Sequence, residues 1–486
     1  DPMGNYDWVK TDILLPDKLF SNTAKTKEGD TGDGILDVFD RYNFTVREDE
    51  PFEKEVAIDP ELLGKAYEKF NAIRPDNFDE FLKALKSGKK GDESKFNKQY
   101  GVYYTPREIV HYMCQQSLIN YLATELEGKA SREEIALLIQ SGETLHEHEV
   151  QAAIKATKTY SPKLSEAIRA NAALLDQKLA AIRVCDPAVG SGAFPVGMMS
   201  EIVRAREVLK TWTKTRKTVY DFKRQCVENS LYGVDIDSGA VEIAKLRLWL
   251  SLIVDEDDIQ NIKPLPNLDY KIVCGNSLVG VEKNLFNLGL FAELESLKPL
   301  YFNATNPTTK QGYKKKIDGL IDQITNGRAD FDFEIYFSEV FHEKRGFDVV
   351  IGNPPYISAI EFANKYGDNL RVILNNTYKS ARGSYDLFVL FIEKGLRLAS
   401  QNGCLVFITP NKYLSANYSV ALREFILSKY SMLQLVDLSP LRVFEEASVY
   451  PVISIIQNAI VNEPVKVLLP PNRDIEIFNE TAFTHA

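Results

Sequence analysis

The sequence predicts an α/β protein built around a mostly parallel, Rossmann-like sheet with helices on both faces. From residue 182 onward, short apolar runs alternate with amphipathic segments, and several of the runs end in Gly, Asn or Asp. Such alternation is typical of parallel sheets, because the crossover helices cover both faces. A length of 486 residues also allows a large core and two or three domains.

Seven strands are expected in this sheet, and the first four run into polar or glycine-rich turns. The strand segments are 182–190, 231–237, 270–278, 347–356, 403–410, 433–439 and 450–459. The helices expected between them are 194–209, 239–254, 385–399 and 418–428. Residues 281–346 interrupt the alternation as a mixed, partly helical insert.

The chain before residue 182 has no comparable strand pattern. Thr105, Pro106 and Glu108 fit a helix start, in which Thr105 caps, Pro106 takes the first helical position and Glu108 closes a capping box. Residues 122–180 are rich in Ala, Glu and Lys and are expected to be helical. We therefore expect four regions, which are an N-terminal mixed region, a largely helical region, an α/β core that contains the insert, and a C-terminal tail. Their bounds are 1–96, 97–181, 182–465 and 466–486.

Composition argues against several classes of protein. No apolar run approaches the roughly 18 residues of a membrane span, and the first residues have no signal-peptide pattern. The five cysteines are scattered without a CxxC pair, which predicts a reducing compartment, no disulfide framework and no zinc site. A cytoplasmic location is therefore expected. The net charge of −10 argues against nucleic-acid binding over the whole surface, but it leaves room for a basic cleft.

Polar residues stand at the ends of the first four expected strands. Asp186 opens the glycine-rich turn 186–192, where the backbone can approach a ligand just before a helix N-terminus. Asp235 ends the second strand, where a carboxylate can accept both hydroxyls of a ribose. Asn276 and Ser277 end the third strand, and Asn353 ends the fourth. A lone strand-end Asp is more often a helix cap than a ligand, and Asn-Pro-Pro-Tyr alone can be a rigid turn. Four polar groups at four successive strand ends instead indicate a nucleoside site.

The ordered set of motifs resembles the gamma-class DNA adenine-N6 methyltransferases. The motifs are GVYYTP, DPAVGSGAF, GVDID, GNSL and NPPY, and they cover roughly residues 97–460. The long insert before NPPY resembles the large members that are fused to nucleases in type IIG restriction-modification systems. The resemblance implies a prokaryotic, site-specific, adenine-specific DNA methyltransferase that uses S-adenosylmethionine on double-stranded DNA.

The resemblance also implies a role for individual residues. Tyr103, Tyr104, Thr105 and Pro106 would pack around the methionine end of the cofactor, and Asp186, Ala188, Gly190 and Gly192 would form the cofactor loop. Asp235 would hold the ribose, with Ile236 beside the adenine ring of the cofactor. Asn276, with Ser277 next to it, would contact the adenine amino group, and Phe391 would line that pocket.

The NPPY motif suggests how the reaction proceeds. The exocyclic N6 of adenine is a poor nucleophile because its lone pair is delocalised into the ring. Hydrogen bonds to the Asn353 side chain and the Pro354 carbonyl would favour a pyramidal nitrogen, and the Pro354–Pro355 pair would fix these acceptors in advance. Tyr356 would stack on the flipped-out base, and by resemblance Phe444 would meet its other face. No metal is expected.

Alternative functions remain at this stage. A protein-glutamine N5 methyltransferase also uses an Asn-Pro-Pro-Tyr motif, although YYTP, DPAVGSG and the long inserts argue against it. A bifunctional restriction enzyme would need a nuclease, and residues 1–100 contain no convincing strand-borne Asp…Glu-x-Lys pattern. A catalytically silent DNA-binding module would have no reason to keep the whole cofactor constellation.

The target-recognition domain of the family has no obvious counterpart here. Three interpretations stay open: the chain is a fragment, a partner subunit reads the DNA sequence, or the inserts do so. The basic clusters 210–218 and 313–318 are candidates for phosphate contact, although a solvated surface explains them as well.

Overall fold

The structure, a computed structural model, describes part of the chain. The described residues are 16–25, 29, 31–34, 36–37, 41, 43–45, 55–57, 64, 105–142, 164–253, 266, 268–281, 288–304, 306–325, 331–366, 368–441, 443–444, 449–469 and 484–485. The chain divides into two compact units, Asp1–Leu63 and Gly64–Ala486. The apolar spacing of residues 62–73 also predicts a helix, and the charged stretch 86–95 predicts a linker or an exposed loop. Apart from Gly64, which is helical, both segments lie outside the described residues, as do Tyr103 and Tyr104.

The first unit contains a turn held together by one carboxylate. Asp37 accepts hydrogen bonds from Ser21 Oγ at 2.5 Å, from the Asn22 amide at 2.9 Å and from the Gly34 amide at 3.0 Å. These hydrogen bonds, led by that of Ser21, lower the pKa of Asp37. The remaining described elements of this unit are η1 (Asp17–Leu19) and the parallel pair β1 (Asn43–Thr45) and β2 (Glu55–Ala57).

The described residues of the second unit form a nine-stranded sheet, in the order β11-β10-β8-β9-β7-β6-β3-β4-β5. Its strands are β3 (Val184–Asp186), β4 (Leu231–Asp235), β5 (Ile272–Cys274), β6 (Phe347–Gly352), β7 (Ala399–Pro410), β8 (Ser431–Asp437), β9 (Pro451–Gln457), β10 (Lys466–Leu469) and β11 (Thr484–His485). All pairs from β5 to β7 are parallel, whereas β9 is antiparallel to β7 and β8. The predicted α/β class and mostly parallel sheet are confirmed.

The order in which the chain adds strands to the sheet reverses beside β3. From β3 it moves outward to β4 and β5, and it then returns to β6 on the other side of β3. Such a reversal separates the loops that leave two neighbouring strands, which creates a crevice beyond their carboxyl ends. The topology therefore places the ends of β3 and β6 beside each other at the position where α/β proteins bind ligands.

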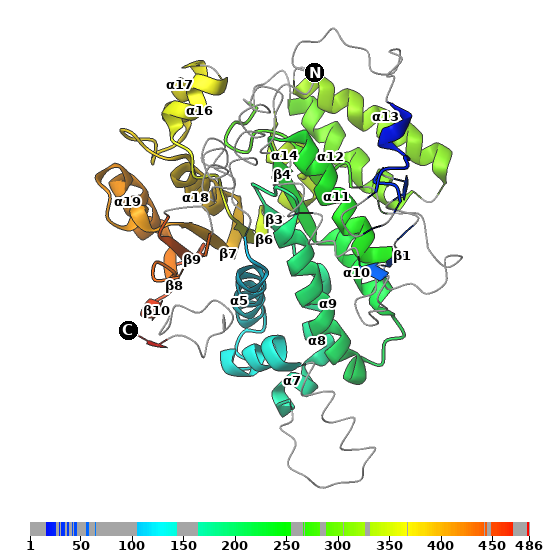
Figure 1. Cartoon of the computed structure of the whole chain (residues 1–486). Helices are drawn as coiled ribbons and strands as arrows, with labels where there is room; N and C mark the ends of the chain where they lie inside the picture. Colours follow the sequence, from blue (N-terminus) through cyan, green and yellow to red (C-terminus); the bar gives the residue numbers. More distant parts are fainter. Residues whose placement is uncertain are drawn as a thin grey trace. The chain divides into compact units, whose positions relative to one another are not determined.

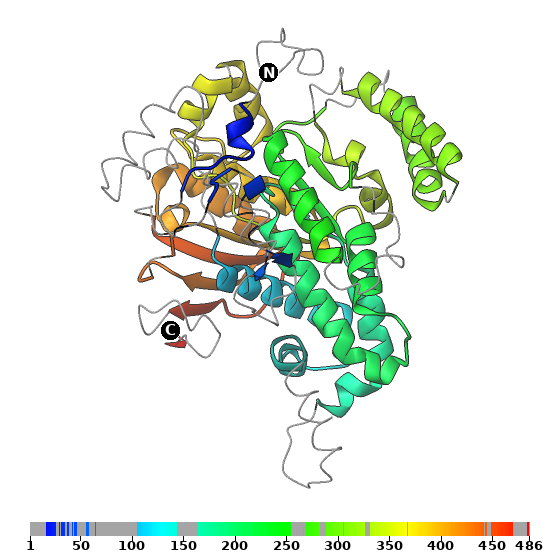
Figure 2. The ribbon, with the colours of Figure 1, turned by 45° about the vertical axis from the view of Figure 1, so that its right-hand side comes forward.

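Two hydrophobic clusters cover the two faces of the sheet. Along β6, Val349 and Ile351 belong to one cluster and Val350 to the other, as expected when successive side chains point to opposite faces. Figures 1 and 2 show α5 and α9 on one side of β6 and β7, and α18 on the other.

The helices divide between these two faces. The first face is covered by α5 (Arg107–Glu125), α7 (Glu166–Ala170), α8 (Ala172–Ala181), α9 (Ala193–Thr213), α10 (Val219–Asn229) and α11 (Ser238–Ile253). The second is covered by α12 (Leu288–Asn303), α13 (Pro307–Ile324), α14 (Phe333–Tyr336), α15 (Ser338–Lys344), α16 (Ala359–Tyr366), α17 (Asp368–Thr377), α18 (Leu387–Leu398) and α19 (Val420–Lys429). Residues 132–142 are also helical, and the short helices η3 (Asn411–Leu414) and η4 (Asn417–Ser419) follow β7.

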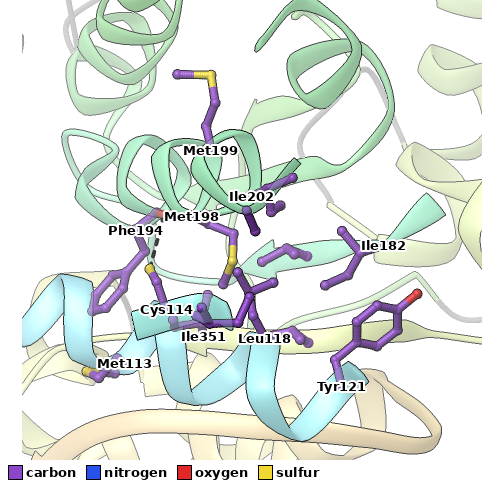
Figure 3. Packing of buried hydrophobic residues seen from close by; sticks show 14 of the residues in the cluster. Met113, Cys114, Leu118, Tyr121, Ile182, Phe194, Met198, Met199, Ile202 and Ile351 are labelled. Atoms are coloured by element: carbon purple, nitrogen blue, oxygen red, sulfur yellow. Dashed lines mark hydrogen bonds between the residues drawn. The ribbon is translucent and has the colours of Figure 1, made fainter. Parts of the chain in front are cut away.

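Helix α5 packs closely on α9. A β-carbon added to Gly197 of α9 would lie 2.5 Å from Val110 Cγ1, so a larger residue would push the two helices apart. Figure 3 shows the packing between them, where Cys114 donates a hydrogen bond from Sγ to the Phe194 carbonyl at 3.9 Å. Because α9 begins directly after the glycine-rich turn, this packing brings the start of α5 to the crevice.

The insert 281–346 is pinned to the sheet by a buried ion cluster. Glu339 of α15 lies 3.2 Å from Lys271 Nζ and 3.6 Å from Lys298 Nζ, and Lys271 also donates to the Tyr232 hydroxyl at 2.6 Å. Lys298 donates to the carbonyls of residues 335 and 336 as well. The predicted helical character of the insert is seen in α12 and α13.

Two short strands extend the sheet beyond the seven that were predicted. Strand β10 runs parallel to β8, and β11 pairs antiparallel with β10. Both strands lie in the segment 466–486, which the sequence analysis treats as a C-terminal tail outside the seven expected strands. β10 is four residues long, which is too short for a reliable alternation of apolar and polar residues. In the described part of the chain, no helix has the length and apolar character needed to cross a membrane.

Candidate functional site

Strands β3, β4, β5 and β6 bring the predicted strand-end residues to one edge of the sheet. Asp186 and Asp235 are the last residues of β3 and β4, Asn276 follows β5, and Asn353 follows β6. These strands are parallel neighbours, so their carboxyl ends meet at the same edge. The arrangement expected from the sequence is thus present in the backbone.

Asp186 lies buried at the centre of this edge. Its Oδ1 accepts a hydrogen bond from the Ala188 amide at 2.9 Å, whereas its Oδ2 has no hydrogen-bond partner among the described residues. Burial, together with the nearby Asp235 charge, raises the pKa of Asp186 well above its usual range, although the Ala188 amide opposes this. A buried carboxylate with one unoccupied oxygen is suited to a cationic or hydrogen-bond-donating ligand.

Glycines create the space around Asp186. A β-carbon on Gly352, the last residue of β6, would lie 2.7 Å from Asp186 Oδ1, so any side chain there would displace the carboxylate. Gly192, at φ +88°, begins α9 and approaches Ala244 of α11, where a β-carbon would lie 3.0 Å from Ala244 Cβ. The role of Gly352 was missed from the sequence, because its restriction comes from a neighbouring strand.

Asp235 holds the glycine-rich turn in place. Its Oδ2 accepts the Gly190 amide at 2.8 Å and its Oδ1 accepts the Asp237 amide at 2.9 Å. Burial raises the pKa of Asp235, while these two amides lower it. The side chain of the next residue, Ile236, is 42% exposed at the strand end, which is unusual for isoleucine and leaves an apolar surface beside the carboxylate.

The GNSL turn joins β5 to the same edge. Asn276 Oδ1 accepts the Leu278 amide at 3.0 Å, which forms a local turn. Ser277 is buried and donates a hydrogen bond from its hydroxyl to the Pro187 carbonyl at 2.6 Å. Ser277 therefore ties the GNSL turn to the glycine-rich turn 186–192, a structural role that the sequence did not indicate. Phe391 is buried on α18, in the cluster on the second face of the sheet.

Asn353 is linked to the start of α5. Its Nδ2 donates a hydrogen bond to Thr105 Oγ1 at 3.1 Å. The predicted capping box is wrong: α5 starts at Arg107, its N-cap is Pro106, and the cap makes no side-chain hydrogen bond. The Thr105 hydroxyl instead contacts Asn353, so the residue before Pro106 meets the first residue of the NPPY motif.

Two aromatic residues predicted to bind the base lie beside each other. The Tyr356 and Phe444 rings are 6.1 Å apart between centroids and inclined at 75°, and Tyr356 also meets Phe388 edge to face. The Tyr356 hydroxyl donates to the Ile408 carbonyl at 3.2 Å, which anchors the ring to β7. The two rings touch edge to face, whereas a base between them would require them to face each other.

Pro354 is buried and Pro355 is half-buried between Asn353 and Tyr356. Because proline fixes φ and has no amide hydrogen, this pair holds the backbone carbonyls in one orientation without competing donors. In the part of the chain that the structure describes, no group of three or more His, Cys, Asp or Glu residues could hold a metal ion.

The sheet order and the strand-end residues agree with the Rossmann-like methyltransferase sheet that the sequence predicts. Residues 229–444 match the model of the Eco57I restriction-modification methylase family, which confirms the predicted resemblance. This match includes the ends of β4, β5 and β6, and with them Asp235, Asn276 and the NPPY motif.

Curated relatives agree with this match. RM.MjaORFECS2P of Methanocaldococcus jannaschii, named as a type II restriction enzyme and methyltransferase, is 28% identical over 85% of this chain and 39% of its own length. The restriction enzyme and methyltransferase RM.Eco57I of Escherichia coli is 26% identical over 49% of this chain and 19% of its own. The adenine-specific methyltransferase PglX of Streptomyces coelicolor is 23% identical over 50% and 18%. The chain thus spans less than half of each of these relatives.

Proposed function

We propose that this chain transfers a methyl group from S-adenosylmethionine to N6 of a flipped-out adenine in double-stranded DNA, within a restriction-modification or related phage-defence system. The observation that carries the proposal is the meeting of Asp186, Asp235 and Asn353 at the reversal of the sheet, with Asn353 held by Thr105. The methylase relatives and the Eco57I family match support the same activity.

The residues at this edge fit S-adenosylmethionine. The unoccupied Oδ2 of Asp186 suits the ammonium group at the methionine end, because a buried carboxylate gains most from a cation. Asp235 would accept the ribose hydroxyls through its remaining lone pairs, and the exposed Ile236 would cover one face of the adenine ring. Ala188, Gly190 and Gly192 let the backbone approach closely, while Asn276 and Phe391 would complete the adenine pocket. When bound, the cofactor supplies an electrophilic methyl group on a sulfonium.

Asn353 and the two prolines would activate the substrate nitrogen. The Asn353 side-chain oxygen and the Pro354 carbonyl would accept the two N6 protons and favour a pyramidal nitrogen whose lone pair is available. Since Thr105 engages the Asn353 amide nitrogen, the same amide can present its oxygen to the substrate. This mechanism depends on acceptors that are fixed before the substrate arrives.

Tyr356 would stack on the extruded base and offset part of the cost of unstacking it. The edge-to-face contact with Phe444 would have to open to admit the base. We propose that Phe444 moves, because the Tyr356 hydroxyl is anchored to the Ile408 carbonyl.

The nuclease and target-recognition parts that such systems need would lie outside this chain or on a partner. The relatives named as restriction enzymes are much longer than the segment that this chain matches, which supports that assignment. A protein-glutamine N5 methyltransferase is not favoured, because the relatives are restriction-modification methyltransferases.

The test is methyl transfer to DNA, read as N6-methyladenine by mass spectrometry. Asn353→Ala should lower turnover about a hundredfold while cofactor affinity stays nearly unchanged, because the lost hydrogen bond matters mainly in the transition state. Asn306→Ala, which removes an exposed helix cap in the insert, is the matched control and should retain turnover. Wild-type turnover in Asn353→Ala would show that the role assigned to Asn353 is wrong.

A further inference from the structure

The loop between α17 and α18, residues 378–385, runs beside the chain that continues from the NPPY motif. The Ala359 amide donates to the Tyr385 carbonyl at 3.0 Å, and the Leu387 amide donates to the Ile357 carbonyl at 2.9 Å. Ser358 and Asp386 form an antiparallel bridge between the same two segments. The loop is therefore fixed to a segment that begins directly after Tyr356.

A buried carboxylate on α18 binds the backbone of this loop. Glu393 of α18 is completely buried and accepts the amides of Lys379 at 3.1 Å and Ser380 at 2.8 Å. The guanidinium of Arg397 pairs with the same carboxylate. Burying a carboxylate is costly unless it is paired and hydrogen-bonded, so these contacts of Glu393 stabilise the conformation of the loop.

Both ends of the loop are anchored by tyrosines. The Tyr378 hydroxyl donates to the Leu278 carbonyl at 2.8 Å, which connects the loop to the GNSL turn. The Tyr385 hydroxyl donates to Asn375 Oδ1 at 2.8 Å, which connects it to α17. Between these anchors the loop exposes Lys379 and Arg382, and Gly383 turns the backbone at φ +69°.

Lys379 and Arg382 are the basic side chains that the loop exposes. Among the described residues, the charged ends of Lys379 and Arg382 make no hydrogen bond or ion pair. Lys412, which follows β7, is also exposed and lies near the half-buried Asp386. In a chain with a net charge of −10, these two exposed cations give the loop a local positive charge beside the proposed catalytic segment.

We propose that Lys379 and Arg382 bind the DNA phosphates next to the flipped adenine. This inference rests on the proposed function, since a flipped base enters the pocket while its backbone phosphates stay at the mouth. Phosphate contacts give no sequence information, but they position the strand and supply much of the affinity. The rigid loop would set the distance between the strand backbone and Asn353.

The test uses the 486-residue chain and a fluorescent random-sequence duplex, with binding followed by anisotropy over a range of salt concentrations. Changing Lys379→Ala and Arg382→Ala together should weaken binding about tenfold at low salt. It should also make the dependence of log K on log salt shallower by about 2, because two phosphate contacts are lost. Cofactor affinity, measured by calorimetry, should not change.

The matched control is the double change Lys315→Ala and Lys316→Ala, which removes two exposed lysines from α13 in the basic cluster 313–318. If the control lowers the salt dependence as much as the loop variant does, DNA binding is a general charge effect and the inference is wrong. If the loop variant weakens cofactor binding instead, the loop holds the cofactor carboxylate and the inference is also wrong.

Failure of this inference can be told apart from failure of the proposed function. Methyl transfer with an unchanged salt dependence would overturn the phosphate contacts and leave the activity intact. A reduced salt dependence in a chain that transfers no methyl group would support the phosphate contacts and count against the activity. Conversion of Arg382→Lys, which keeps the charge, should retain the wild-type salt dependence.

Discussion

Asp186 is buried and Glu339 is mostly buried, but the surroundings of the two carboxylates are opposite. Among the described residues no cation pairs with Asp186, and burial raises its pKa. Glu339 lies between Lys271 and Lys298, and these two charges lower its pKa although burial acts in the other direction. Asp186 lies at the carboxyl end of the parallel strands, whereas Glu339 lies beneath the insert.

The difference separates a binding site from a structural contact. The Glu339 carboxylate has two lysine counter-charges within the chain, so the cluster stabilises the attachment of the insert. Asp186 has no such counter-charge among the described residues, and its Oδ2 makes no hydrogen bond to them. We therefore expect the loss of Glu339 to affect folding and the loss of Asp186 to affect ligand binding.

The largest expected effect is that of Glu339→Gln. Removing one partner of a buried ion cluster leaves the lysines without a counter-charge, which should lower the free energy of unfolding by about 3–5 kcal/mol. Urea denaturation at neutral pH measures this loss. The variant should bind S-adenosylmethionine as the wild type does wherever it is folded.

The pH dependence gives a second test of the same cluster. Burial lowers the pKa of Lys298 to about 8, below its ordinary value of 10.5. A lysine that holds its proton less tightly when folded makes the fold more stable as pH rises from about 8 towards 10.5. Above pH about 8, Lys298 is neutral in the folded protein and no longer needs the Glu339 counter-charge. The stability that Glu339→Gln loses should therefore be smaller there than at neutral pH. Glu343→Gln, on the same helix but 55% exposed, is the control and should cost little at any pH.

Asp186→Asn should weaken S-adenosylmethionine binding by about thirtyfold, or about 2 kcal/mol, because a charge-assisted hydrogen bond is lost. Stability should not fall. A carboxyl group whose pKa is higher in the folded than in the unfolded protein lowers the free energy of unfolding once pH exceeds the unfolded-state pKa. Asparagine does not ionise, so it removes this cost. Calorimetry and denaturation of the same sample measure both quantities, and a stability loss without a loss of affinity would reverse the comparison.

The same carboxylate predicts how cofactor affinity depends on pH. A cationic ligand favours ionised Asp186, so affinity should rise with pH through the raised pKa of this group. In Asp186→Asn this part of the pH dependence should disappear. Asp269→Asn, at a carboxylate that is 45% exposed and paired with Lys314, should retain the wild-type profile.

Asp235→Ala should weaken cofactor binding at least tenfold, or about 1.4 kcal/mol, because it removes the proposed ribose contact. It also frees the Gly190 amide, so the glycine-rich turn becomes less ordered. Equilibrium binding of S-adenosylmethionine and of adenosine tests whether the loss comes from the ribose contact, because both ligands contain the ribose. If adenosine binds the variant as well as it binds the wild type, Asp235 does not hold the ribose.

Thr105→Val should have the smallest effect, about 1 kcal/mol in turnover, because it removes one hydrogen bond to the Asn353 amide and keeps the side-chain shape. Thr105→Ser keeps the hydroxyl and should restore most of the rate. Single-turnover methyl transfer at saturating cofactor measures this step. A fall in cofactor affinity with unchanged turnover would favour the cofactor contact that the family resemblance implies for Thr105.

The strands and their polar ends could be predicted because both signals are local. An apolar run followed by Gly-Ser-Gly or Asn-Pro-Pro already determines where a strand ends and which side chains follow it. Contacts between distant segments could not be predicted in this way. Thr105 looked like a helix cap, but its hydroxyl meets a residue 248 positions later. Gly352 and Ser277 likewise owe their roles to neighbouring strands and turns.

The base-binding rings illustrate the same limit. Both Tyr356 and Phe444 were placed at the site from short motifs, and the structure brings them into contact. Their relative inclination depends on packing against Phe388 and on the bond to Ile408, neither of which has a sequence signal. Residue identity could be predicted here, whereas ring orientation could not.

The most direct test of the central claim is a calorimetric titration of the chain with S-adenosylmethionine, repeated with Asp186→Asn and Glu339→Gln. We predict one binding site, a markedly weaker affinity in Asp186→Asn, and an affinity in folded Glu339→Gln equal to that of the wild type. The absence of binding heat in the wild type at millimolar cofactor would contradict the claim that this edge of the sheet is a cofactor site. Equal weakening in both variants would contradict it as well.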